Sequence, residues 1–176
     1  ASVMSIVLYE TVTWQKLPVE FNSPQHLQHV DSVSFRSNTE LATCDQSVII
    51  IWQFDRENAT VRCVIDSGIG KVFGMRYEHG SARATTEHGR LLLAATPECA
   101  ILDSKTGNIA IKFDCASRVR SCSWIGKDCR RVLLVPDSTW SVIETYDARS
   151  GAKLAIFQSH LDTVMCFSVS PCSSML

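Results

Sequence analysis

The chain has 176 residues, of which 45% are hydrophobic, 8% aromatic and 20% charged, and its formal net charge is −1. A chain of this length and apolar content can bury a core, which excludes a predominantly disordered protein. The near-zero net charge supplies no overall field for a nucleic-acid backbone or an anionic membrane, so such binding needs a local patch. The longest apolar runs, such as residues 48–52, are about five residues, against roughly 20 for a membrane-spanning helix. We expect a soluble protein with no membrane insertion.

Eight cysteines are present, and no two of them are closer than six positions. No C-x-x-C pair therefore begins a zinc or redox site, and we interpret these cysteines as small buried hydrophobic residues in a reducing compartment. The chain opens without a basic stretch followed by an apolar stretch, so we expect no secretory signal in it. The expected location is intracellular, either cytoplasmic or nuclear.

A strand pattern recurs along the chain, in which a valine is followed by apolar residues three and five positions later. Its period of two indicates a strand with one buried face. The leading valines stand 42, 47 and 45 residues apart, at Val30, Val72, Val119 and Val164. Ahead of the first valine, residues 6–9 predict a strand that ends on Tyr9-Glu10. After it, a short apolar strand is expected at 41–44, and a further strand ends on Trp52-Gln53.

The units that begin at Val72 and Val119 repeat this plan and add a fourth strand. An aromatic residue or leucine followed by an acid closes the third strand, and a Thr-Gly or Ser-Gly pair supplies the positive φ of a tight hairpin. In the first of these units the second strand, closing pair, turn glycine and fourth strand are 91–96, Leu102-Asp103, Gly107 and 109–113. In the second they are 132–135, Tyr146-Asp147, Gly151 and 154–157. Four short strands in about 45 residues are typical of a propeller blade.

Residues 159–171 resemble the G-H-x-x-x-V opening and first strand of a WD40 repeat, with Ser159 in place of the glycine. His160 stands four residues before Val164, and His26 stands in the same way before Val30. Tyr146-Asp147 and Trp52-Gln53 fall where the family has its closing W-D pair. The other two repeats depart from the pattern, because Gly68 and Cys115 occupy the histidine position. As a whole, the chain is similar to the WD40 β-propeller family.

This resemblance implies an all-β propeller of four-stranded antiparallel blades. The strands amount to about four blades, and the family commonly has about seven, so we expect a fragment of a larger disc. The expected division is the end of one blade at 1–25, three blades at 26–69, 70–115 and 116–158, and the start of the next at 159–176. Unpaired edge strands at the ends lead us to expect poor solubility or strand exchange between copies.

The resemblance also implies a buried structural hydrogen-bond network in which each polar group satisfies another. One such network would consist of His26, Thr43, Asp45 and Trp52. His160 and Asp137 would have the corresponding roles in other repeats. We interpret these residues as structural.

The sequence contains no combination of residues and spacings that is typical of a catalytic site. His26 and His29 form an H-x-x-H pair, but no Asp, Glu or Cys at workable spacing completes a metal site. The nucleophile-elbow, zinc-protease and phosphate-loop motifs are absent. We therefore expect no enzyme activity, no metal, no cofactor and no small-molecule substrate.

Protein binding is the function that the implied architecture favours, because a rigid disc presents many loops on its faces. The aromatic and charged residues expected on the strand-entry face are Trp140, Arg118, Lys71, His29 and Asp162. A basic cluster formed by Arg118, Arg120, Lys127, Arg130 and Arg131 offers an alternative as an RNA-associated protein. We expect this cluster to divide between two opposite faces. A role as one domain of a larger enzyme or transport machine also stays open.

Overall fold

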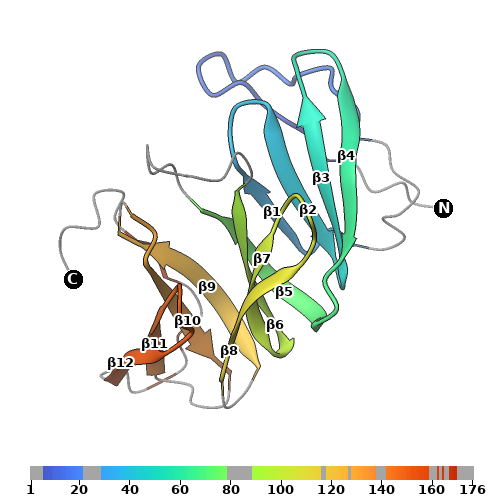
Figure 1. Cartoon of the computed structure of the whole chain (residues 1–176). Helices are drawn as coiled ribbons and strands as arrows, with labels where there is room; N and C mark the ends of the chain where they lie inside the picture. The colour runs from blue at the N-terminus through green and yellow to red at the C-terminus, as the bar shows by residue number, and fades with distance from the viewer. Residues whose placement is uncertain are drawn as a thin grey trace.

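The computed structural model of the chain consists of three four-stranded antiparallel sheets (Figure 1). It describes residues 6–21, 29–78, 89–115, 118–126, 128–137, 142–158, 162, 164 and 167–169. These residues contain no helix, so the prediction of an all-β chain with four-stranded antiparallel units is confirmed. In this described part, no helix is long and apolar enough to span a membrane.

Each sheet is a meander in which every strand pairs with the next one along the chain. Sheet 1 consists of β1 (Ser32–Phe35), β2 (Glu40–Asp45), β3 (Val48–Phe54) and β4 (Ala59–Asp66). Sheet 2 consists of β5 (Gly70–Tyr77), β6 (Arg90–Pro97), β7 (Cys99–Asp103) and β8 (Ile109–Phe113). Sheet 3 consists of β9 (Val119–Ile125), β10 (Arg131–Pro136), β11 (Val142–Asp147) and β12 (Lys153–Gln158).

The acids that end the third strands of sheets 2 and 3 shape the turns. The Asp103 carboxylate accepts backbone hydrogen bonds from Lys105 at 2.9 Å and Thr106 at 2.8 Å. The Asp147 carboxylate accepts the equivalent bonds from Arg149 at 3.0 Å and Ser150 at 2.7 Å, which lower the pKa of Asp147. Such Asx turns explain why an acid recurs at this point of the repeat. The glycines that complete the two turns, Gly107 and Gly151, both have a φ of 73°.

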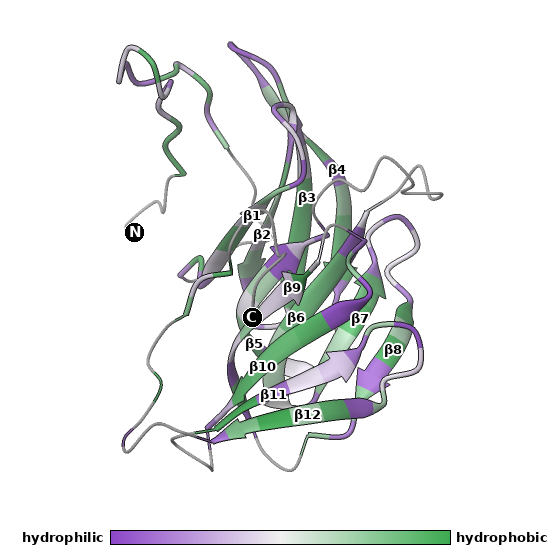
Figure 2. Cartoon of the chain, turned by 90° about the vertical axis from the view of Figure 1, so that its left-hand side faces the viewer, coloured by the Kyte–Doolittle hydropathy of each residue, from purple (hydrophilic) through white to green (hydrophobic). Residues whose placement is uncertain are grey.

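The three sheets pack face to face in chain order, so each central strand is buried on both sides. Successive residues of β6 illustrate this arrangement, since Leu93 lies in the core shared with sheet 1 and Leu92 in the core shared with sheet 3. In Figure 2, β6 and β10 are hydrophobic along most of their length. The outer face of sheet 1 lies under the N-terminal segment, residues 6–21, through Leu8, Val19 and Phe21. On the outer face of sheet 3, Val164 and Phe167 pack on Ile125, Leu133 and Val135.

Two of the predicted features differ from the structure. The strand expected at 6–9 is reduced to one isolated bridge between Tyr9 and Lys16. The expected propeller, as part of a larger disc, is not confirmed, because the described strands form three separate sheets in an open series. Strand periodicity and turn residues act within each unit, whereas closure depends on contacts between the ends, which the periodicity does not encode.

Candidate functional site

The first strands of sheets 2 and 3 bring an aromatic ring and basic side chains together. The guanidinium carbon of Arg118 lies 3.8 Å from the centroid of the Phe73 ring, and the Lys71 ammonium lies 5.4 Å from it. A break in the β5–β6 register between Val72 and Gly74 leaves Phe73 as an inserted residue. Such a bulge re-aims a side chain out of the regular alternation. This is why Phe73 is half-buried beside charged groups while Val72 is fully buried.

Asp137, at the end of the β9–β10 hairpin, holds the two arginines in place. Its carboxylate accepts hydrogen bonds from Nε and Nη2 of Arg120 at 2.9 and 2.7 Å. The Nε atom of Arg118 lies 3.6 Å from the other carboxylate oxygen. The Asp137 backbone N–H also donates to the Arg118 carbonyl at 2.7 Å. We call Lys71, Phe73, Arg118, Arg120 and Asp137 the Phe73 cluster.

A polar cavity of about 290 Å³ adjoins the cluster, between β1, β5 and β9. Phe73 and Arg120 line both the cavity and the cluster, and Asp31 and Arg76 bring further charges to the wall. The exposed end of sheets 2 and 3 therefore combines one aromatic ring with an excess of positive side chains. Such a surface suits a partner segment that carries both apolar and acidic groups.

The structure places the predicted site residues unequally. Lys71 and Arg118 come together at Phe73, whereas His29 is exposed two residues before Asp31, and Asp162 is also exposed. Trp140 lies outside the described residues, as do His26 and His160. The sequence analysis missed Phe73. A bulky aromatic residue directly after the leading valine of a strand repeat was the signal that could have indicated it.

Part of the predicted structural network is visible in sheet 1. The Trp52 indole N–H donates to the Thr43 hydroxyl at 2.8 Å, and both residues are buried. Asp45 is buried at the end of β2, near this pair in sequence. Asp137, in contrast, is the partner of Arg118 and Arg120 at the Phe73 cluster.

The basic residues of the β9–β10 hairpin occupy two ends of the same strand. Arg118 and Arg120 lie at the start of β9 and pair with Asp137, at N–O distances of 3.6 and 2.7 Å. Arg130 lies beyond the end of β9 and pairs with Asp128 at 3.1 Å. The two groups thus lie at opposite ends of β9, a seven-residue strand with a length of roughly 20 Å. Lys127 lies outside the described residues.

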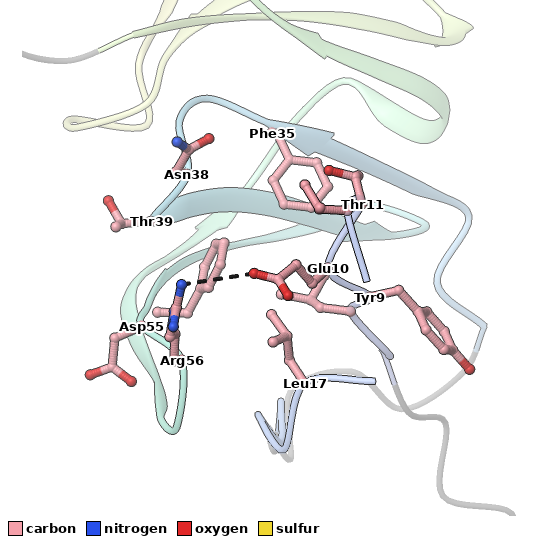
Figure 3. A pocket seen from close by; sticks show the side chains of 12 residues that line it. Tyr9, Glu10, Thr11, Leu17, Phe35, Asn38, Thr39, Asp55 and Arg56 are labelled. Carbon is pink, nitrogen blue, oxygen red and sulfur yellow. Dashed lines mark ion pairs between the residues drawn. The ribbon is translucent and has the colours of Figure 1, made fainter. Parts of the chain in front are cut away.

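A larger hollow, of about 610 Å³, lies between residues 6–21 and sheet 1 (Figure 3). Leu8, Leu17, Phe35 and Phe54 give it an apolar wall. At its rim, Arg56 and Glu10 form an ion pair at 3.8 Å, with Arg56 highly exposed. Because exposed pairs of this kind contribute about 0–1 kcal/mol, the rim adds little rigidity to the hollow.

Among the described residues, no group of three or more His, Cys, Asp or Glu side chains is arranged to hold a metal ion. Four free cysteines are buried, Cys44, Cys99, Cys122 and Cys129, while Cys63 and Cys115 are half-buried. Cys166 and Cys172 lie outside the described part of the chain. Burial raises the pKa of Cys44 and Cys122 to about 12, which keeps these thiols protonated at neutral pH.

We expect Cys115 to be alkylated at least about 10-fold faster than Cys44 or Cys122 at pH 8, because only a thiolate reacts. A hydrogen bond with the Cys99 thiol lowers the pKa of Cys115 below its usual 9.0. The pH at which its alkylation rate is half of the maximum should therefore lie below 9.0, and the rate should fall as the pH is lowered through this midpoint. Peptide mass spectrometry after timed iodoacetamide exposure measures each site. Replacing Cys99 by alanine should move the Cys115 midpoint upward, and an unmoved midpoint would contradict the assigned cause.

None of the known protein-family models matches the chain, and no curated protein matches it. Solved structures with a similar fold include the computationally designed Ika8 protein, with a TM-score of 0.63 and 14% sequence identity. That similarity covers 89% of this chain and 44% of the Ika8 chain, so this chain spans less than half of the Ika8 length. The computationally designed Ika4 protein has a TM-score of 0.61 and 11% identity, over 83% of this chain and 81% of its own.

The assignment to the WD40 family was wrong. No family model supports it, the two structures named above are designed proteins, and the described sheets are three separate units. The residues that suggested the family have local roles instead. The acid of the closing pair caps a turn at Asp147, and Trp52 fills the core on the outer face of sheet 1. At these sequence identities the likeness to solved structures concerns the fold alone.

Proposed function

We propose that this chain is a non-catalytic protein-binding module and that the Phe73 cluster is its contact surface. The observation that carries the proposal is the stacking of the Arg118 guanidinium on the Phe73 ring at 3.8 Å. Aromatic and arginine side chains dominate the binding energy of protein interfaces, especially where they are held in one conformation before binding. Phe73 holds Arg118 and Asp137 holds both arginines in this way, at and directly before the start of β9.

The partner that fits this surface is a protein segment with an acidic residue beside an apolar one. The cluster contains three cationic side chains and one carboxylate, and Phe73 supplies the apolar contact. Arginine binds carboxylates in a planar, two-point geometry, which adds specificity to the charge attraction. The polar cavity beside the cluster gives room for the flanking residues of such a segment.

We expect Arg118→Ala to weaken binding of the partner by about 10-fold to 30-fold, since an interface arginine of this kind is worth about 2 kcal/mol. The matched control is Arg130→Ala, which removes an arginine that is 58% exposed and paired with Asp128 in the hairpin turn. This control should change the affinity by less than about threefold. Both variants should retain the melting temperature of the unchanged chain, because neither side chain lies in the core.

The experiment compares proteins captured by the unchanged chain and by the two variants, followed by calorimetry with the purified partner. A protein that is lost with Arg118→Ala and kept with Arg130→Ala supports the proposal. Equal loss with both variants, or no loss with Arg118→Ala, would overturn it. If only substitutions of Arg130 and Arg131 abolish binding, with a steep dependence on salt, the bound partner is a nucleic acid.

A further inference from the structure

The two outer faces of the sheet series are each covered over one half. On sheet 1, residues 6–21 bury the residues of β2 and β3, including Leu41 and Trp52. The β1 and β4 residues on the same face stay open, with Val33 38%, Phe35 49%, Val61 39% and Val64 43% exposed. Phe35 is the cross-strand neighbour of Leu41, so both side chains point to this face.

Sheet 3 is also covered in part. Val164 and Phe167 cover the β9 and β10 residues of its outer face, where Ile125 and Val135 are each 2% exposed. On the last strand, β12, Phe157 is 43% exposed. It is the cross-strand neighbour of Ile143, which belongs to the same outer cluster.

The N-terminal segment itself exposes apolar side chains to solvent. Tyr9, Val12 and Trp14 are 56%, 84% and 75% exposed. The segment and β12 lie at opposite ends of the molecule (Figure 1). The first and last layers of the sheet series thus each expose apolar groups beside a covered part of the layer.

We propose that the outer face of sheet 3 binds residues 6–21 of a second copy of this chain, in a head-to-tail contact. The second copy's segment then lies over Phe157, beside Val164 and Phe167. In the same contact, residues 164 and 167–169 of the first copy come to lie beside β1 of the second and cover Val33 and Phe35. The contact continues the packing that the chain uses internally, where sheets 1 and 2, and sheets 2 and 3, bury a shared core between their facing sides. It does not depend on the proposed function of the Phe73 cluster.

Sedimentation velocity on the whole chain tests this association, because a head-to-tail contact gives a mass above that of one chain that rises with concentration. Phe157→Asp should raise the dissociation constant by about 10-fold to 100-fold, since it places a charge where the contact would bury an aromatic ring. Ile156→Asp is the matched control, because Ile156 is 55% exposed on the same strand but neighbours Glu144 on the opposite face. This control should change the dissociation constant by less than about threefold.

A mixing experiment identifies the direction of the contact. Trp14→Asp should also block association, and aspartate tolerates the positive φ of 56° at this position. Each variant keeps one intact end, so an equal mixture of Trp14→Asp and Phe157→Asp should form a dimer of one copy each and nothing larger. Circular dichroism confirms that each variant is folded, and Phe157→Ser and Trp14→Ser are the substitutes if an aspartate variant unfolds. A single-chain mass for the unchanged protein at all concentrations, or no dimer on mixing, would overturn the proposal.

Discussion

Replacing Trp52 by alanine is expected to lower the free energy of unfolding by about 3–5 kcal/mol, the usual cost of removing a buried large aromatic side chain. Trp52 is 1% exposed and packs edge to face on Phe21, with ring centroids 5.2 Å apart. The substitution also removes the indole that donates to the Thr43 hydroxyl at 2.8 Å. Because Phe21 belongs to residues 6–21, the variant should loosen this segment as well. Urea unfolding followed by circular dichroism, at one fixed protein concentration, measures the change.

Phe35→Ala is the matched control for this prediction. Phe35 lies on the same outer face of sheet 1 and packs edge to face on Phe54, with ring centroids 6.2 Å apart, but it is 49% exposed. Its removal should cost less than about 1.5 kcal/mol, because less apolar surface returns to water. Equal losses for the two variants would show that burial under residues 6–21 does not stabilise the chain.

Glu40→Ala should cost about 2–4 kcal/mol, somewhat below the usual cost of breaking a fully buried ion pair, because the partner arginines are partly exposed. The Glu40 carboxylate is buried and accepts hydrogen bonds from Arg62 at 2.6 Å and Arg36 at 3.3 Å. It also accepts a bond from the Tyr77 hydroxyl at 3.2 Å, and this bond joins sheet 1 to sheet 2. Burial raises the pKa of Tyr77, so the hydroxyl keeps its proton and remains a donor across the physiological range.

The chain offers a control with another glutamate, whose ion pair has the same nitrogen–oxygen distance as that of Glu40 with Arg62. Glu98 pairs with Lys112 at 2.6 Å, but the two side chains are 42% and 53% exposed. Glu98→Ala should therefore cost less than about 1 kcal/mol. A cycle of Glu40→Ala, Tyr77→Phe and the double variant separates the bond between the sheets from the pairs within sheet 1. No coupling energy in that cycle would contradict a stabilising bond between Glu40 and Tyr77.

The repeated strands could be read from the sequence because their causes are local. The valine pattern at Val72 and Val119 marked β5 and β9. Gly107 and Gly151 marked the hairpins that precede β8 and β12. The same local character explains the wrong family assignment. Acid-capped turns and two-faced strands recur wherever short antiparallel strands are stacked, so they indicate a type of fold and not a family.

The candidate site could be predicted only in part. The sequence predicts Arg118 and Lys71 as exposed charges near strand starts, and they do meet, but it does not indicate the ring between them. Phe73 reaches that position through a register break in β5, and no spacing rule gives the place of a bulge. Asp137 was expected in a buried network and is instead the partner of two arginines.

The sequence by itself determined that this chain folds into four-stranded antiparallel units, because strand periodicity and turn chemistry act over a few neighbouring residues. Only the tertiary structure decided that β5 and β9 lie side by side, that Phe73 and Arg118 stack, and that Glu40 joins two sheets through Tyr77. It also decided which halves of the outer faces stay uncovered. These features arise between residues about 40 positions apart, where the packing of whole sheets sets the distances and no local pattern specifies them.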